Sequence, residues 1–425
     1  MPDLIQRRKT FLAPTYQNFY QRPLHLVRGE GLRLWDADGR EYLDCYNNVV
    51  SVGHCHPRVV ETLCRQAGRL NTHTRYLHEN VVELAEMLVA KLPDAIEVCV
   101  FTCTGTEAND LAAVIAREVT GNRGMVVSES SYHGVSELVR SLSTGSYPAG
   151  DRPDWLAVIE PPNLYRGPIG RDDPDAGAKY LELAVRELDA LERRGHDLAA
   201  LMIDLVWDSN GPLAAPPDYV RGLCAEVRRR GGLVIADEVQ SGYCRSGRNW
   251  WCCDNYGITP DIITCGKPMG DGHPLAMMAA NRELMRAYAE KFHYFNTFGG
   301  NPVAAAVGKA VIDVIDEENL LRNARDTGAY FETGLRELAA RHQFVGDVQG
   351  CGLFWGLDMV CDAESKSPFS DSQMRRLGSL IADEGVITGT SGRYGQILKL
   401  RPPLPFTRDH ADTALGAIER ALQRF

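Results

Sequence analysis

Six short apolar runs that alternate with helical patterns constrain this chain more than any other feature of its sequence. They lie between residues 98 and 305 and read VCVFT, GMVVSE, WLAVIEPP, LAALMIDL, GLVIADEV and DIITCG. Strands buried on both faces of a parallel sheet have such continuous apolar runs, and crossover helices account for the segments between them. The sequence therefore predicts an α/β fold built on a large, mostly parallel central sheet.

The segments on either side of this region predict a second, smaller unit. The stretch GLRLWDADGREYLD alternates apolar and polar residues around a turn, which is typical of a β-hairpin. Apolar residues recur every three or four positions over residues 57–92, after Pro302 and over residues 320–340, which predicts amphipathic helices. A chain of 425 residues exceeds what one core usually serves. We expect an N-terminal segment (1–60), a large domain (61–305) and a small C-terminal α/β domain (306–425), with the small domain built from both ends.

Composition and charge exclude several classes of protein. The net charge of −10 disfavours nucleic acid and anionic membranes as partners, and no apolar stretch reaches the length of a membrane span. The opening MPDLIQRRKT lacks the apolar core of a signal peptide, which favours a cytoplasmic protein with its 12 cysteines reduced. The segment His54-Cys55-His56 contains metal-ligand side chains, but adjacent residues do not readily close a tetrahedral shell, so no metal is expected.

Two charged residues at strand ends point to a specific chemistry. Asp237 ends the run LVIA, and Lys267 follows the run DIITC and Gly266. Ligands of α/β sheets bind at the carboxyl ends of the strands, where a desolvated lysine can form an imine. The separation of 30 residues (267 − 237) fits one strand–helix–strand unit. Alone, each residue reads as an ordinary surface residue, but together they favour pyridoxal 5′-phosphate (PLP), whose aldehyde binds lysine and whose pyridine nitrogen pairs with a carboxylate.

A phosphate site and a ring contact complete this interpretation. The strand over residues 98–102 runs into a small-residue turn and the start of a helix, where backbone N–H groups and the helix dipole can bind an anion. A helix cap would select the same residues. Tyr132 and His133 follow the next strand, so Tyr132 is a candidate to lie on the pyridine face, with His133 beside it. A buried core tyrosine is the competing interpretation.

Together these residues resemble the class III aminotransferases of PLP fold-type I, over nearly the whole chain. The family pattern matches here as ADEVQSG at residues 236–242 and CGK at residues 265–267. The resemblance implies that Asp237 pairs with the pyridine nitrogen and Lys267 holds the cofactor as a Schiff base. It further implies that Val239 packs on the ring, that Gln240 binds the ring hydroxyl, and that the phosphate contacts are Gly105 and Thr106.

One family feature implies an assembly. A threonine from the neighbouring subunit completes the phosphate site in the family, and the segment NTFGGNP at residues 296–302 matches it. The matching residue is Thr297. The resemblance therefore implies a homodimer with shared active sites.

Three stretches are more similar to the phospho-lyases of ethanolamine phosphate and phosphohydroxylysine than to general transaminases. They read YLDCYNNVVSVGHCHP, LNTHTRYLHEN and GKPMGDGHP. This subgroup catalyses 1,2-elimination on a phosphorylated amine. Lys267 then removes a proton from the aminated carbon, and phosphate leaves from the adjacent carbon to give aldehyde, ammonia and inorganic phosphate.

Departures from the transaminase pattern bear on the substrate. Many class III transaminases bind a substrate carboxylate with an arginine that pairs with an upstream glutamate; here the matching places hold Lys399 and Asp204. Arg401 is a further candidate, although it can equally just end a strand. A phosphate dianion needs cationic donors, for which Arg75 and Lys399 are the preferred candidates. An ω-amine transaminase that uses pyruvate or 2-oxoglutarate is the alternative, and a PLP-binding protein without turnover is a third.

Overall fold

The computed structural model describes residues 2–16 and 18–425 and has a seven-stranded sheet at its centre. In spatial order the strands are β4 (Val98–Thr102), β10 (Ala276–Ala280), β9 (Ile262–Cys265), β8 (Leu233–Asp237), β7 (Leu198–Ile203), β5 (Gly124–Ser128) and β6 (Leu156–Ile159). All run parallel except β10, which is antiparallel to both neighbours. The six predicted strands are confirmed. The strand β10 has no strand signal in the sequence, because its residues AMMAA include no β-branched or aromatic side chain.

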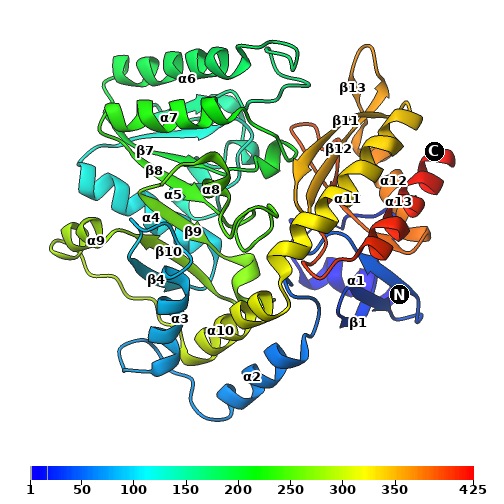
Figure 1. The fold of residues 1–425 in the computed structure, drawn as a ribbon, viewed down its shortest axis with the longest axis horizontal. Helices are drawn as coiled ribbons and strands as arrows, with labels where there is room; N and C mark the ends of the chain where they lie inside the picture. Colours follow the sequence, from blue (N-terminus) through cyan, green and yellow to red (C-terminus); the bar gives the residue numbers. More distant parts are fainter. Residues whose placement is uncertain (1, 17) are drawn as a thin grey trace.

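Helices cover both faces of this sheet, which explains why its strands are apolar throughout (Figure 1). One face, with Met125, Ala200 and Ile235, packs against α4 (Gly105–Thr120), α5 (Glu137–Ser141) and α9 (Arg282–Ala289). The alternate residues Val126 and Leu201 face the other side, with α6 (Ala176–Arg193), α7 (Pro217–Arg229), α8 (Cys252–Tyr256) and α10 (Pro302–Glu317). The helices α2 (Pro57–Ala67) and α3 (Glu79–Val89) pack on α10. Within the described ranges, no helix is both long and apolar enough to cross a bilayer.

Both chain ends build a second lobe beside the large sheet (Figure 1). The predicted hairpin is confirmed: β2 (Arg33–Asp36) and β3 (Glu41–Asp44) are antiparallel, β1 (Leu26–Glu30) extends them, and β14 (Val386–Ile387) from the C-terminal part joins β3 in parallel. A further sheet contains β11 (Val345–Cys351), β12 (Phe354–Asp362), β16 (Ile397–Leu400) and β15 (Gly389–Ser391), and β13 (Ser367–Pro368) pairs with β12. The remaining helices are α1 (Pro2–Phe11), α11 (Leu320–Arg341), α12 (Asp371–Asp383) and α13 (Arg408–Gln423). The first part of the chain thus shares a sheet with the last.

Candidate active site

A cavity of about 320 Å³ lies at the carboxyl ends of the parallel strands, the edge at which α/β sheets bind ligands. Its walls come from the turn after β4, from the segments that follow β5, β7, β8 and β9, and from the loop after β3. Nine of the residues that the sequence singled out line this one cavity: Gly105, Thr106, Tyr132, His133, Asp204, Asp237, Val239, Gln240 and Lys267. They come from distant parts of the chain, so the fold brings together what the sequence analysis assembled from separate motifs.

The start of α4 forms an anion-binding turn. Thr104 caps the helix by accepting the Glu107 N–H, and the Glu107 side chain accepts the Thr104 N–H in return. The first two helical N–H groups, those of Gly105 and Thr106, lie before any carbonyl that an α-helix can offer them. They therefore stay free to bind an anion. A side chain on Gly105 would place its Cβ 3.0 Å from both Val239 methyl groups, so a substitution there would force Val239 to shift.

Asp237 ends β8 and is held by a buried network. One carboxylate oxygen lies 2.8 Å from Asn109 Nδ2 and 2.7 Å from His133 Nδ1, and the other accepts the Val239 N–H. Asn109 also donates to the His133 carbonyl and accepts from the Thr264 hydroxyl. Asp237 is only 4% exposed. This network orients a carboxylate at the cavity wall, as an electrostatic partner for a ring nitrogen requires.

Lys267 begins the short 3₁₀ helix η4 (Lys267–Gly270), immediately after β9. It lines the cavity together with Asp237, and the protein around it lowers the pKa of its ammonium group, mainly by desolvation and secondly through the charge of Arg401. A lower pKa leaves more of the amine neutral at physiological pH. Lys267 is therefore suited to act as a nucleophile toward an aldehyde and as a base.

Lys399 and Arg401 lie behind the cavity wall and do not line it. Lys399 lies in β16 and Arg401 directly follows the strand, and the Lys399 ammonium lies 3.0 Å from Asp208 Oδ1. Gln240 donates to the other Asp208 oxygen at 2.7 Å and accepts from Arg401 at 2.5 Å. The Lys399 pKa falls to about 8, mainly because of burial and the neighbouring Arg401. Lys399 is thus paired with Asp208 rather than with Asp204, the residue that the sequence comparison had matched to the family glutamate.

Arg75 and Thr297 lie on the surface. The Arg75 guanidinium stacks on the Phe295 ring, 3.9 Å from its centroid, and His73 stacks on Tyr76 beside it. Tyr76, Phe295 and neighbouring apolar residues are strongly exposed, with Leu77 fully so. We call this surface the aromatic patch, and define it by His73, Arg75, Tyr76, Leu77, Phe295, Thr297 and Phe298. Neither Arg75 nor Thr297 lines the cavity of its own chain.

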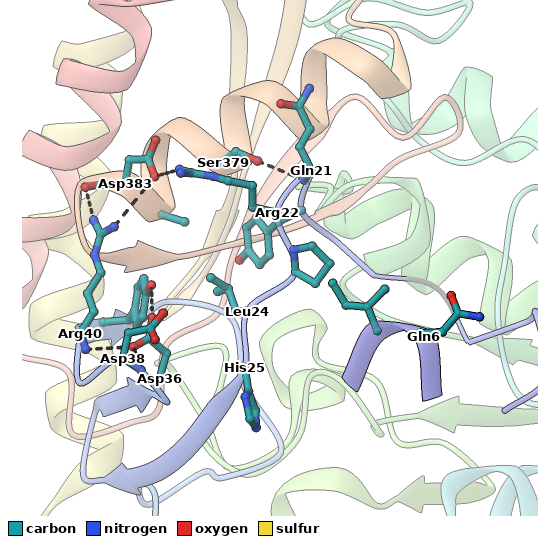
Figure 2. A pocket seen from close by; sticks show the side chains of 15 residues that line it. Gln6, Gln21, Arg22, Leu24, His25, Asp36, Asp38, Arg40, Ser379 and Asp383 are labelled. Atoms are coloured by element: carbon teal, nitrogen blue, oxygen red, sulfur yellow. Dashed lines mark hydrogen bonds and ion pairs between the residues drawn. The ribbon is translucent and has the colours of Figure 1, made fainter. Parts of the chain in front are cut away.

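A larger cavity, of about 690 Å³, lies between α1 and the terminal sheet (Figure 2). Several of its polar side chains pair with one another: Arg22 and Arg40 both reach Asp383, and Tyr42 donates to Asp36. Its walls contain no lysine and no thiol. The chemistry therefore belongs to the smaller cavity around Lys267.

Two residues of the site, Asn109 and Asp208, were not predicted from the sequence. Asn109 is buried in α4 among apolar neighbours such as Ala108 and Leu111, and a polar side chain on the apolar face of a helix is a usable signal. Asp208 lies in the short 3₁₀ helix η3 (Asp208–Asn210) after β7, without any pattern that marks it.

Known proteins resemble this chain over its whole length. The family model "Aminotransferase class-III" matches residues 15–422. A Caenorhabditis elegans protein named ethanolamine-phosphate phospho-lyase homolog 1 is 34% identical over 99% of this chain and 93% of its own. An Arthrobacter phospholyase solved with phosphoethanolamine is 38% identical, with a TM-score of 0.95 and 100% of both chains covered. An amine transaminase from an uncultivated Pseudomonas species, solved in its PLP-bound form, is 28% identical, with a TM-score of 0.89 over 97% and 98% of the two chains.

Proposed function

Because this chain belongs to the class III aminotransferase family, we propose that it is a PLP-dependent phospho-lyase that acts on a phosphorylated amine such as O-phosphoethanolamine. The observation that carries the proposal is the 38% identity, across the full length of both chains, with a phospholyase solved with phosphoethanolamine. The products are an aldehyde, ammonia and inorganic phosphate.

The cavity fits PLP in charge and shape. Gly105 and Thr106 offer free N–H groups to the phosphate, and Val239 lines the same cavity as the residue that would pack on the ring. Asp237, fixed by Asn109 and His133, is the partner for the pyridine nitrogen. When bound, PLP supplies the electron sink that stabilises negative charge on the carbon next to the substrate nitrogen.

Lys267 performs the proton transfer. With PLP bound and a substrate amine in place, Lys267 would be the base that removes the proton from the aminated carbon. The electron pair of that C–H bond forms a double bond to the adjacent carbon, as the C–O bond to phosphate breaks and phosphate leaves with its bonding pair. One water then hydrolyses the two-carbon product to acetaldehyde and ammonia. The reaction has no net oxidation, so no keto acid is needed.

The substrate phosphate needs positive charge that a single chain does not supply at the cavity. Among the described residues, Lys267 is the one lysine or arginine that lines it. The aromatic patch carries Arg75 and Thr297 on an exposed apolar surface of the kind that is buried in protein interfaces. We therefore propose a homodimer in which the patch of a second copy brings Arg75 to the substrate phosphate and Thr297 to the cofactor phosphate.

The buried side chains of Lys399 and Arg401 act indirectly in this proposal. Lys399 neutralises Asp208, and Arg401 binds Gln240, so the two residues hold the wall against which the ring would lie. The residue that contacts the substrate phosphate directly is instead Arg75 of the second copy. The Gln240 side chain donates one amide N–H to Asp208 and accepts a hydrogen bond from Arg401 at its oxygen. Its second amide N–H remains for the ring hydroxyl.

An ω-amine transaminase is the second candidate, favoured by the likeness to the PLP-bound amine transaminase. The two activities differ in what the reaction requires. A transaminase needs pyruvate or 2-oxoglutarate and releases no phosphate. A lyase releases phosphate from O-phosphoethanolamine without an acceptor.

The test is a phosphate-release assay on the holoenzyme with O-phosphoethanolamine, phosphohydroxylysine and, as a control, unphosphorylated ethanolamine. The proposal expects phosphate only from the first two substrates and no effect of added keto acid. Turnover that appears only with a keto acid, without phosphate release, would establish the transaminase. No spectral response of the bound cofactor to any amine would favour a binding protein without turnover.

A further inference from the structure

The loop over residues 45–53 crosses from the terminal sheet to the active-site cavity, where Val49 forms part of the wall. Its ends are tied to the C-terminal segment, because the Arg401 N–H donates to the Cys45 carbonyl and the Leu404 N–H donates to the Ser51 carbonyl. The loop thus joins three parts of the chain at the cavity. Whatever fixes this loop also fixes one side of the site.

Three hydrogen bonds attach the loop to residues next to the catalytic groups. The Asn48 amide donates to Gln240 Oε1 at 2.9 Å. The Ser51 hydroxyl donates to the Pro268 carbonyl at 2.8 Å, one residue beyond Lys267. The Val52 N–H donates to a carboxylate oxygen of Asp271 at 3.0 Å. Two of these three bonds reach the turn that carries Lys267.

Asp271 has a backbone conformation suited to this contact. It follows η4 directly and has a φ of +46°, in the left-handed region that glycine, asparagine and aspartate tolerate best. The turn aims the carboxylate back toward the loop. Burial raises the pKa of Asp271 to about 7, against the Val52 N–H and the nearby His54, which favour the ionised form.

Hydrogen bonds also hold the first residues of the loop. Asp44, at the end of β3, is fully buried and accepts the N–H groups of Tyr46 and Asn47. Its second oxygen lies 2.6 Å from His54 Nε2 and also accepts the Asn47 side chain. Asp44 therefore closes the base of the loop, and Asp271 holds its far side.

We propose that Asp271 is a positioning residue, which clamps the loop over residues 45–53 onto the turn that carries Lys267 and thereby aligns Val49 and Gln240 with the catalytic lysine. This assigns a role to the stretch GKPMGDGHP beyond its lysine. The clamp acts through a hydrogen-bond acceptor in a left-handed turn, and it does not depend on whether the enzyme eliminates phosphate or transfers an amino group.

Three substitutions separate the parts of this role. Asp271→Asn keeps both the acceptor oxygen and the tolerance of the left-handed turn. Asp271→Gly keeps the turn but removes the acceptor, and Asp271→Ala removes the acceptor and strains the turn. The matched control is Asp362→Gly, because Asp362 also accepts backbone N–H groups, from Glu364 and Ser365, in an exposed turn away from the site.

The direct readout is hydrogen exchange at the Val52 amide, followed by mass spectrometry of peptides from the loop in apoenzyme and holoenzyme. Loss of one hydrogen bond predicts roughly two- to tenfold faster exchange in Asp271→Gly. The value of kcat/KM for amine turnover should fall by a comparable factor. Asp271→Asn should restore both quantities, while Asp362→Gly should leave them unchanged.

Two results would overturn the proposal: unchanged Val52 exchange in Asp271→Gly, or equal losses in the Asn and Gly variants. The exchange readout keeps this test separate from the proposed function, because it needs no turnover. If Asp271→Gly does not fold, Ser51→Ala removes the neighbouring bond of the same loop. It should also speed exchange at Val52, and unchanged exchange there would refute a loop held by these two bonds.

Discussion

Replacing the buried Glu238 with glutamine should change how the stability of this protein depends on pH. Glu238 follows Asp237 but points away from the cavity and is fully buried. One of its oxygens accepts the Cys253 N–H at 2.7 Å and the other accepts the Ser241 hydroxyl at 2.5 Å. Glutamine preserves both bonds, since its oxygen accepts the Cys253 N–H and its amide donates to the Ser241 oxygen. The substitution therefore removes the ionisation and little else.

The size and sign of the effect follow from the pKa of Glu238, which burial raises from 4.5 to about 7. Between pH 4.5 and 7 the unfolded chain releases this proton while the native protein keeps it, so the native wild-type protein loses stability as the pH rises. At 1.36 kcal/mol per pKa unit the total is about 3 kcal/mol. The free energy of unfolding of Glu238→Gln should therefore rise by that amount relative to wild type between pH 4.5 and 7. Above pH 7 the difference should stay constant.

The assay is urea denaturation of both holoenzymes at pH 5, 6, 7 and 8, at fixed protein and cofactor concentrations. Glu226→Gln serves as the control. Hydrogen bonds to Arg229 and Arg230 lower the Glu226 pKa to about 2, so ionised Glu226 makes its full contribution to the free energy of unfolding above pH 5. The difference in this free energy between Glu226→Gln and wild type should therefore not change from pH 5 to 8. A difference between Glu238→Gln and wild type that does not widen from pH 5 to 7 would refute the reasoning.

Further predictions concern the site and the assembly. Lys267→Ala should abolish the visible absorbance band of the covalently bound cofactor as well as turnover, and persistence of that band would contradict the assignment. Lys399→Met leaves the buried charge of Asp208 without its closest cationic partner and should lower the free energy of unfolding by about 3–5 kcal/mol, measured by denaturation; a loss below about 1 kcal/mol would mean that Arg401 compensates fully. Mixing the Lys267→Ala and Thr297→Ala proteins should restore activity, because each mixed dimer contains one intact site, whereas no recovery after subunit exchange would contradict shared sites.

The local parts of the fold were predictable from the sequence because each has its own pattern. The six parallel strands are continuous apolar runs, and the hairpin at β2 and β3 alternates around a turn. The strand β10 was missed because alanine and methionine fit a helix as well as a strand, and its antiparallel place between β4 and β9 depends on contacts across the sheet. The cytoplasmic location and the domain boundaries stay predictions.

The candidate site was also predictable only in part. Asp237 and Lys267 were found because strand ends meet at one edge of a parallel sheet. Asn109 was not, because its contact with Asp237 joins residues 128 positions apart. The sequence also left open in which direction the side chains of Lys399 and Arg401 point. In the structure a buried carboxylate, Asp208, holds Lys399 away from the cavity, and such a pairing has no local signature.

The most direct test of the central claim measures phosphate, ammonia and acetaldehyde together during turnover of O-phosphoethanolamine by the purified holoenzyme without any keto acid. The account predicts equal amounts of the three products, loss of all three in Lys267→Ala, and no change when 2-oxoglutarate is added. An absolute requirement for 2-oxoglutarate, with glutamate formed and phosphate retained on the product, would contradict it.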